Sequence, residues 1–487
     1  MAVSEAHQVA TRRAAVFFLI FALGAGIPAR AQMGNNPTSA SNPFFGSVTL
    51  EPANDELLKL TLDDAIRRGL ENNLGVREAA SAQQALQGER NEAMQQFLPT
   101  ITLTGSTGIF EHDLAALGFK PSLAAVFSPQ VPGGGPANFP LITRDALTEG
   151  QIHFSQTLFS GPVIAGYKAA GAAERSAYYA RRSAEGDVVQ EVATEYLRAI
   201  AAASDVNNAK ALLAEDQLAL DQASAAHQAG TVPKLDVLRA QVEWQTQQQA
   251  VIAAENDLDK DLILLKREIG IAPGQKILLT DQAPYSELAL QTPAEVRAEA
   301  YANRQDYQNV QNQVAEYRAL RSAYRSERFP SLSFRGYYGV STVNGAGTHG
   351  NFAVFGTLSV PIFREAELRG NVAAAQAELN AAQSRLADLR EQIDEQVRDA
   401  LLDTAAAGKL VDVARSNVDL ARQALSDEAD RVKAGVDDNL PLVTAQATLA
   451  AAQNSLVNSL FQYNVAKLGL ARAAGVIETE YRDYIGR

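Results

Sequence analysis

The sequence predicts a mainly α-helical fold that carries a small membrane β-barrel and is internally duplicated. First, four short segments alternate apolar and polar residues with a period of two, which is typical of strands with one apolar and one polar face. Second, Ala-rich segments of about seventy residues follow these strands, long enough for helices of roughly 100 Å at 1.5 Å per residue. Third, the same order of segments occurs twice along the chain.

Composition excludes several classes of function. The 487-residue chain has 20% charged and 7% aromatic residues, a mixture that suits long helices packed through small side chains. Its formal charge of −13 argues against a nucleic-acid-binding protein, which needs a basic surface. The chain has no Cys, which excludes disulfides, thiolate metal sites and cysteine nucleophiles.

The N-terminus has the pattern of a cleaved export signal. Two arginines precede a short apolar run over 14–27, and Ala29 and Ala31 form an A-x-A cleavage site. We therefore expect residues 1–31 to be a signal peptide. No later window offers the roughly 20 apolar residues that a membrane-spanning helix requires, so the sequence predicts that strands cross the membrane.

The first repeat is expected over 61–270, after an N-terminal arm over 32–60 that is rich in Pro, Asn, Ser and Gly. Thr61 has the position of a helix N-cap, and this helix is predicted to run to about Phe97, where a Leu-Pro pair ends it. Two strands, a long helix, a turn and a second helix follow. The strands are expected at about 98–110 and 151–159, separated by a long loop, and the helical hairpin turns at about 229–236.

The second repeat is expected over 292–475, after a linker over 271–291 and before a C-terminal tail over 476–487. Thr292 and Glu295 form a capping box around a Pro at the first helical position, which is a strong helix start. Strands are predicted at about 330–342 and 352–362, and the hairpin turn at about 434–441.

The two repeats align at constant offsets. Asn72 corresponds to Asn303 at an offset of 231, and Gly270 corresponds to Gly475 at an offset of 205. The offset falls from 231 to 205 between the paired strands, so the second repeat mainly differs by a shorter loop between its two strands.

Four amphipathic strands cannot close a barrel, and backbone groups in lipid must all be paired. The chain is therefore expected to oligomerise. A dimer gives eight strands and an interior filled by side chains, whereas a trimer gives twelve and leaves a passage. The Thr and Ser residues of the polar faces favour the trimer. In the second long helix Leu379, Leu386 and Ile393 are spaced by seven, which indicates coiled-coil packing between helices.

These features resemble the outer membrane efflux protein family, the TolC-like channels of tripartite pumps and type I secretion systems. The residues that carry the resemblance span about 61–475 and are Phe97-Leu98-Pro99-Thr100-Ile101, Gln156-Thr157-Leu158-Phe159-Ser160-Gly161, Asn303-Arg304-Gln305-Asp306, Arg328-Phe329-Pro330-Ser331-Leu332, Leu358-Ser359-Val360-Pro361-Ile362-Phe363 and the two Ala-Gly pairs at the hairpin turns. The resemblance implies a homotrimer with a twelve-strand barrel in the outer membrane lipid and a periplasmic helical tunnel. It also implies a tip that opens when a periplasmic adaptor and an inner-membrane pump, of RND or ABC type, engage.

The hairpin tips hold the candidate functional residues. The resemblance implies that Gly230 and Gly435 begin the turns and that Asp236 narrows the mouth. The second tip departs from the family pattern, and there Asp437 and Asp438 are candidates for a displaced acidic ring that favours cations. The alternative is that both are solvated turn residues that start the next helix.

No enzymatic function is expected. A G-x-G-x-x-G match over 345–350 lies between two predicted strands rather than between a strand and a helix, so it predicts a surface turn. The five His are scattered, and no nucleophile–base arrangement, cofactor site or metal site is predicted. The competing hypothesis is a periplasmic coiled-coil adaptor or scaffold without a channel, but such a protein has one hairpin and no lipid-facing strands.

Overall fold

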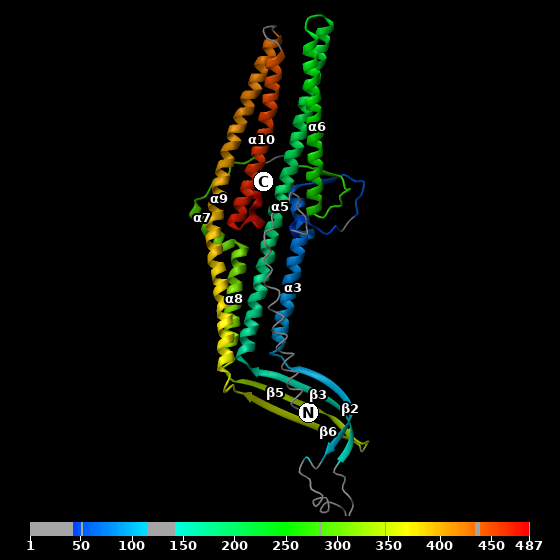
Figure 1. Cartoon of the computed structure of the whole chain (residues 1–487), viewed down its shortest axis with the longest axis vertical. Helices are drawn as coiled ribbons and strands as arrows, with labels where there is room; N and C mark the ends of the chain where they lie inside the picture. The colour runs from blue at the N-terminus through cyan, green and yellow to red at the C-terminus, as the bar shows by residue number, and fades with distance from the viewer. Residues whose placement is uncertain are drawn as a thin grey trace, which may run out of the picture.

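The computed structural model describes residues 42–49, 52–113, 116, 142–281, 285–345, 347–433 and 439–486. The described chain is elongated, with a β-sheet at one end and two long helical hairpins that extend away from it (Figure 1). The expected signal cleavage site at Ala29 and Ala31 lies outside the described residues, as do Gly435, Asp437 and Asp438 of the second tip. No helix in the described ranges is both long enough and apolar enough to cross a membrane.

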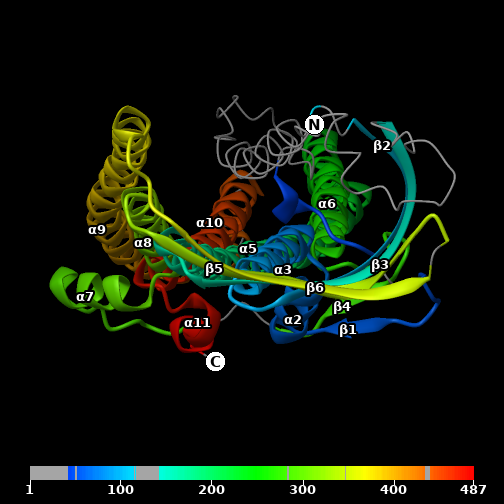
Figure 2. The ribbon, with the colours of Figure 1, turned by 90° about the horizontal axis from the view of Figure 1, so that it is seen from below.

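The sheet has four antiparallel strands in the order β2-β3-β5-β6, which form one curved layer at the end of the helices (Figure 2). Their bounds are Thr100–Asp113, Ile142–Phe159, Ser331–Val343 and Thr348–Ser359. The two strands of the first repeat extend further than predicted, so the predicted loop over 111–149 is too long. The residues at its start and end belong to β2 and β3, which stay paired as far as Asp113 and Ile142, and Arg144 Nε lies 2.6 Å from Glu111 Oε2 across them.

The helix that precedes each strand pair is divided in two, whereas the sequence predicted one continuous helix. In the first repeat α2 (Leu62–Asn72) and α3 (Leu74–Gln95) meet at Asn73, and in the second α7 (Pro293–Asn303) and α8 (Gln305–Ser326) meet at Arg304. Both junction residues have extended backbone, with ψ angles of 135° and 122°. The predicted helix starts are confirmed, because the Thr61 and Thr292 side chains accept hydrogen bonds from the backbone N–H of the third residue of their helices.

Two antiparallel helical hairpins run along the long axis of the molecule. In the first, α5 (Gly161–Gln228) packs against α6 (Lys234–Glu268), and in the second α9 (Glu365–Lys433) packs against α10 (Asn439–Ala474). Leu379 and Ile393 of the predicted stripe are buried, at 3% and 0% exposure. The stripe therefore packs against neighbouring helices, as predicted.

The main hydrophobic core lies midway along the molecule, where the short helices meet the long ones. Val188 and Tyr196 of α5 lie in it together with Ile393 of α9 and Leu468 of α10. The core also includes segments that the sequence analysis described as arm, linker and tail. Strand β1 (Leu58–Leu60) pairs in parallel with β4 (Ile277–Leu279), and α11 (Ile477–Ile485) buries Ile477, Tyr481 and Ile485.

Candidate functional site

One face of the sheet is apolar and lies open. The strand register aligns Leu103, Ile152, Tyr338 and Phe352 across the four strands. These four side chains are between 50% and 79% exposed. A contiguous apolar surface of this kind marks a contact with lipid or with another molecule.

The opposite face is polar. Thr102, His153 and Tyr337 are aligned across it, and the His153 and Tyr337 rings lie 5.7 Å apart. A hydroxyl of the same face, that of Thr104, donates to the Gln151 carbonyl oxygen. The predicted alternation is therefore present in the folded strands, with one face suited to hydrocarbon and one to water.

The sheet has two free edges. Within the described ranges, β2 pairs only with β3, and β6 pairs only with β5. The outer sides of both strands thus present unpaired backbone N–H and C=O groups. Such an edge is a template for pairing with another strand, and it cannot persist in hydrocarbon, where no water satisfies the backbone.

The first hairpin turn lies at the end of the molecule remote from the sheet. Gly230 has a φ angle of 76°, in the left-handed region that favours glycine, and ends α5. The Thr231 N–H donates to the Ala226 carbonyl and the Gly230 N–H to the His227 carbonyl, at 3.0 and 2.9 Å. These two hydrogen bonds are those of a Schellman motif, so the turn is fixed by its own backbone.

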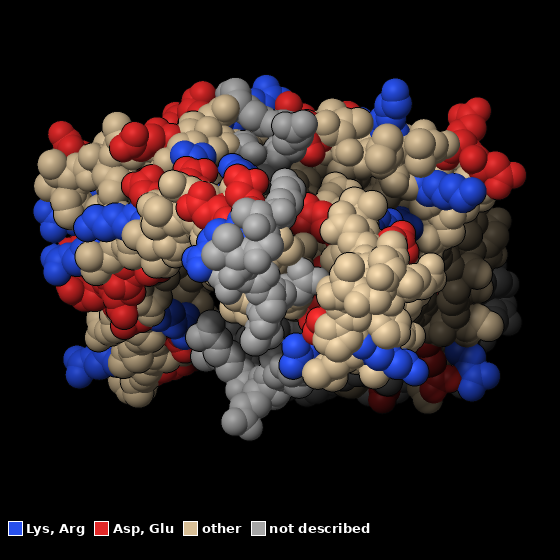
Figure 3. Space-filling model, turned by 90° about the horizontal axis from the view of Figure 1, so that it is seen from above, with Lys and Arg blue, Asp and Glu red and all other residues tan. Residues whose placement is uncertain are grey.

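The structure brings Asp236 to this tip, in the first turn of α6, where its Oδ1 lies 3.5 Å from Arg239 Nη1 on the same helix. Acidic and basic side chains are interspersed over this end of the molecule (Figure 3).

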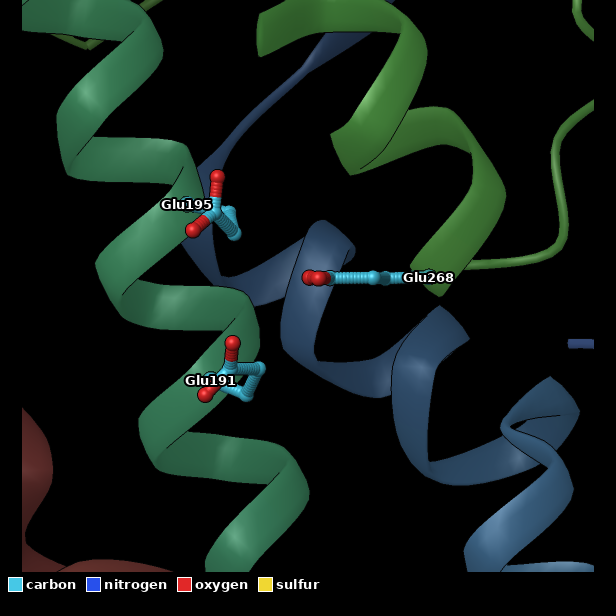
Figure 4. A group of neighbouring side chains, drawn as sticks. All are labelled: Glu191, Glu195 and Glu268. Atoms are coloured by element: carbon cyan, nitrogen blue, oxygen red, sulfur yellow. The ribbon is translucent and has the colours of Figure 1, made fainter. Parts of the chain in front are cut away.

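The structure also shows an acidic cluster that the sequence analysis missed. Glu191 and Glu195 on α5 face Glu268 at the end of α6, and their carboxylate oxygens lie within 4.8 Å of one another (Figure 4). Burial, helped by the neighbouring carboxylates and opposed by Arg198, raises the pKa of Glu195 to about 7 and that of Glu268 to about 9. The available sequence signal was the i, i+4 spacing of two acids placed between apolar residues of α5. Their contact with a residue 73 positions later gives no local signal.

A second buried charged group lies at the α7–α8 junction. The Arg304 side chain is 6% exposed and binds Asp306 through two hydrogen bonds, of 3.0 and 2.6 Å. Its Nη1 also donates to Gln396 Oε1 at 2.8 Å and to the Ala473 carbonyl oxygen at 3.5 Å. Arg304 therefore connects the junction to both α9 and α10.

The sequence matches the model of a known protein family. The sequence model described as "Outer membrane efflux protein" matches residues 65–270 and 296–476. The chain is 24% identical to the pyoverdine export outer membrane protein OpmQ of Pseudomonas aeruginosa, over 68% of this chain and 70% of that protein. It is 27% identical to the toluene efflux pump outer membrane protein TtgI of Pseudomonas putida, over 61% of this chain and 64% of that protein.

Solved structures share the fold. The Campylobacter jejuni CmeC outer membrane channel superimposes with a TM-score of 0.68 at 16% identity, over 92% of this chain and 94% of that chain. The open state of the Neisseria gonorrhoeae MtrE outer membrane channel also gives 0.68, at 18% identity, over 85% of this chain and 89% of that chain.

Proposed function

We propose, since the chain belongs to the outer membrane efflux protein family, that three copies assemble into one conduit through the outer membrane. Members of this family are outer membrane channels of bacterial efflux pumps, and they transport without catalysing a reaction. The single observation that carries the trimer proposal is the sheet, which has an open apolar face and two free edges.

Pairing between copies removes both edges. If β2 of one copy pairs with β6 of the next, three copies close a barrel of about twelve strands, which is wide enough for an aqueous passage. The register then turns Leu103 and its aligned neighbours to lipid and Thr102 and its neighbours to the lumen. Every strand backbone group acquires a partner, as hydrocarbon demands.

The helical hairpins are proposed to form the periplasmic tunnel and to meet a periplasmic adaptor and an inner-membrane pump at their tips. The tips lie at the end of the molecule opposite the sheet, where partners that span the periplasm would reach them (Figure 1). OpmQ is described by pyoverdine export and TtgI by toluene efflux. We extend this class of cargo, small organic molecules, to the present chain.

Lysine substitutions on adjacent residues of β2 test the proposal. Leu103→Lys places a charge on the apolar face, where burying it in lipid costs about 2–4 kcal/mol per copy near the bilayer midplane. We expect this variant to fail to assemble in the outer membrane. Thr102→Lys, on the polar face, should still yield a cross-linkable trimer extracted only with detergent. Equal assembly of the two variants would refute the proposed orientation. A wild-type protein released by osmotic shock without detergent would instead favour the periplasmic scaffold.

The gate assignment is also a proposal, and it rests on two adjacent acidic residues at the predicted second turn, where the chain departs from the family pattern. Asp437 and Asp438, in three copies, are proposed to line the mouth and favour cations. Changing both to Asn should lower the cation preference of the channel in planar bilayers, with the conductance retained. Unchanged selectivity would identify both residues as turn residues with no role in the mouth.

A further inference from the structure

The acidic cluster of Glu191, Glu195 and Glu268 lies in the main core, between α5 and the C-terminal end of α6. Glu191 and Glu195 are one helical turn apart, and Glu268 points toward the space beside them from the facing helix (Figure 4). All three carboxylates offer an oxygen within 4.8 Å of the others. Three acids thus converge on one point from two helices.

The cluster lacks enough positive charge for three carboxylates. Glu195 Oε1 forms an ion pair with Arg198 Nη1 at 2.7 Å. Among the described residues, the second Glu195 oxygen and both Glu268 oxygens are buried and have no hydrogen-bond partner. Glu268 is 0% exposed. It is also the last residue of α6, where the helix dipole adds negative charge.

The second repeat has no acidic residues at the positions that align with the cluster. An offset of 205 aligns Val188 with Ile393 and Val192 with Val397. All four are buried at 1% exposure or less, which supports this alignment of α5 with α9. The same offset aligns the three acids with Gln396, Ala400 and Ala473.

In the second repeat an arginine side chain provides positive charge at the aligned positions. Arg304, which corresponds to Asn73 at the offset of 231, donates to Gln396 Oε1 and to the Ala473 carbonyl oxygen. Asn73 cannot do this, and its amide instead donates to the Phe44 carbonyl oxygen at 2.7 Å. At the aligned positions the second repeat therefore has the Arg304 guanidinium and no acids, whereas the first has three acids and Asn73, with Arg198 paired to Glu195.

We propose that Glu191, Glu195 and Glu268 bind one hard divalent cation per chain, with Ca²⁺ preferred. The donors are all carboxylate oxygens, which suit Ca²⁺, Mg²⁺ and Mn²⁺ rather than the softer metals. Two ligands of one Ca²⁺ at about 2.4 Å lie at most about 4.8 Å apart, and one oxygen of each carboxylate lies within that distance of the other two. Mg²⁺ demands near-octahedral geometry and gives up its waters reluctantly, so a buried site of protein carboxylates favours Ca²⁺. The ion joins α5 to the end of α6 at the level of the core, as Arg304 joins α8 to α9 and α10 in the second repeat.

Cation titration of the purified full-length protein tests the site. The protein, held in mild detergent and stripped with EDTA, is titrated with CaCl₂, MgCl₂ and MnCl₂ at constant ionic strength. We expect calorimetry to give one Ca²⁺ per chain and thermal unfolding to shift upward with Ca²⁺. Failure of all three cations to bind would overturn the proposal and show that protons alone neutralise the cluster.

Matched variants locate the binding. Glu268→Gln should weaken Ca²⁺ binding at least tenfold, yet melt no lower than the wild type in EDTA, because burial already opposes ionisation of this carboxyl and Gln replaces it with a neutral group of the same size. Glu316→Gln removes a half-buried carboxylate of α8, whose pKa burial also raises to about 7, and should keep the full Ca²⁺ response. Retained affinity in Glu268→Gln, or equal loss in Glu316→Gln, would place the ion elsewhere. None of these outcomes depends on whether the chain forms a channel.

Discussion

Replacing Lys467 by Met should stabilise the protein at neutral pH, although Lys467 has partners in the folded state. Its side chain is 0% exposed on α10, and Nζ donates to the Ser286 carbonyl oxygen at 3.3 Å and lies 4.6 Å from the Tyr463 ring centre. Burial nevertheless lowers the pKa of Lys467 from 10.5 to about 8. The charged form is therefore disfavoured in the folded chain.

The magnitude follows from this pKa. A folded-state pKa of about 8 against 10.5 unfolded corresponds to about 3 kcal/mol of stability lost below about pH 8, where the lysine is charged in both states. The folded state binds fewer protons than the unfolded state between these values, so stability rises with pH from about 8 to 10.5. Methionine keeps the length of the side chain and removes the charge, but it forfeits the hydrogen bond to Ser286, worth about 1 kcal/mol. The expected net gain at pH 7 is about 2 kcal/mol.

Thermal unfolding in detergent at pH 7 and pH 10.5 measures this gain. Lys467→Met should melt higher than the wild type at pH 7, and the difference should disappear or reverse at pH 10.5. Lys409→Met, at an exposed position of α9, is the matched control and should show no such pH dependence. A Lys467→Met variant that melts lower than the wild type at pH 7 would refute the reasoning and show that the carbonyl and the ring fully compensate the buried charge.

Three further results are expected. Thr292→Ala should lower stability by about 1 kcal/mol in thermal unfolding, because it removes the capping box with Glu295, and retained stability would mean that packing alone fixes this helix start. Gly230→Ala should destabilise the first hairpin turn by about 1–2 kcal/mol, since a Cβ is strained at this φ angle, and hydrogen exchange should become faster only near the turn. Burial opposes ionisation of Asp306, but hydrogen bonds from Arg304 outweigh it and lower the pKa of Asp306. The stability that Asp306 contributes is thus present above pH 3.8 and lost below it, so Asp306→Asn should melt lower than the wild type at pH 7 and approach it at pH 3.

The features predicted from the sequence are those set by neighbouring residues. Strand alternation, the Thr61 and Thr292 caps and the Gly230 turn each depend on contacts within a few positions, and the structure contains all of them. The fold class followed from these signals and from the duplication. Gly230 and Asp236 are brought to one tip as expected, but their role in a mouth stays a prediction.

The features that were missed depend on distant contacts. Asn73 interrupts the first helix because its amide binds Phe44 and because Ser47 pairs with it as a β-bridge. Strand β1 exists only because β4, about 220 residues later, pairs with it. The acidic cluster likewise joins residues that are remote in sequence. No local pattern encodes such contacts.

The two hairpins are closely matched in length. Helix α5 has 68 residues and α9 has 69, and their returning partners have 35 and 36. Both hairpins therefore reach nearly the same height above the sheet, since one residue adds only about 1.5 Å. Four residues added to each helix of one hairpin alone would raise its end by about 6 Å and give the proposed trimer an uneven rim. Insertions and deletions in these helices should consequently be tolerated only when both halves of the duplicated chain change together.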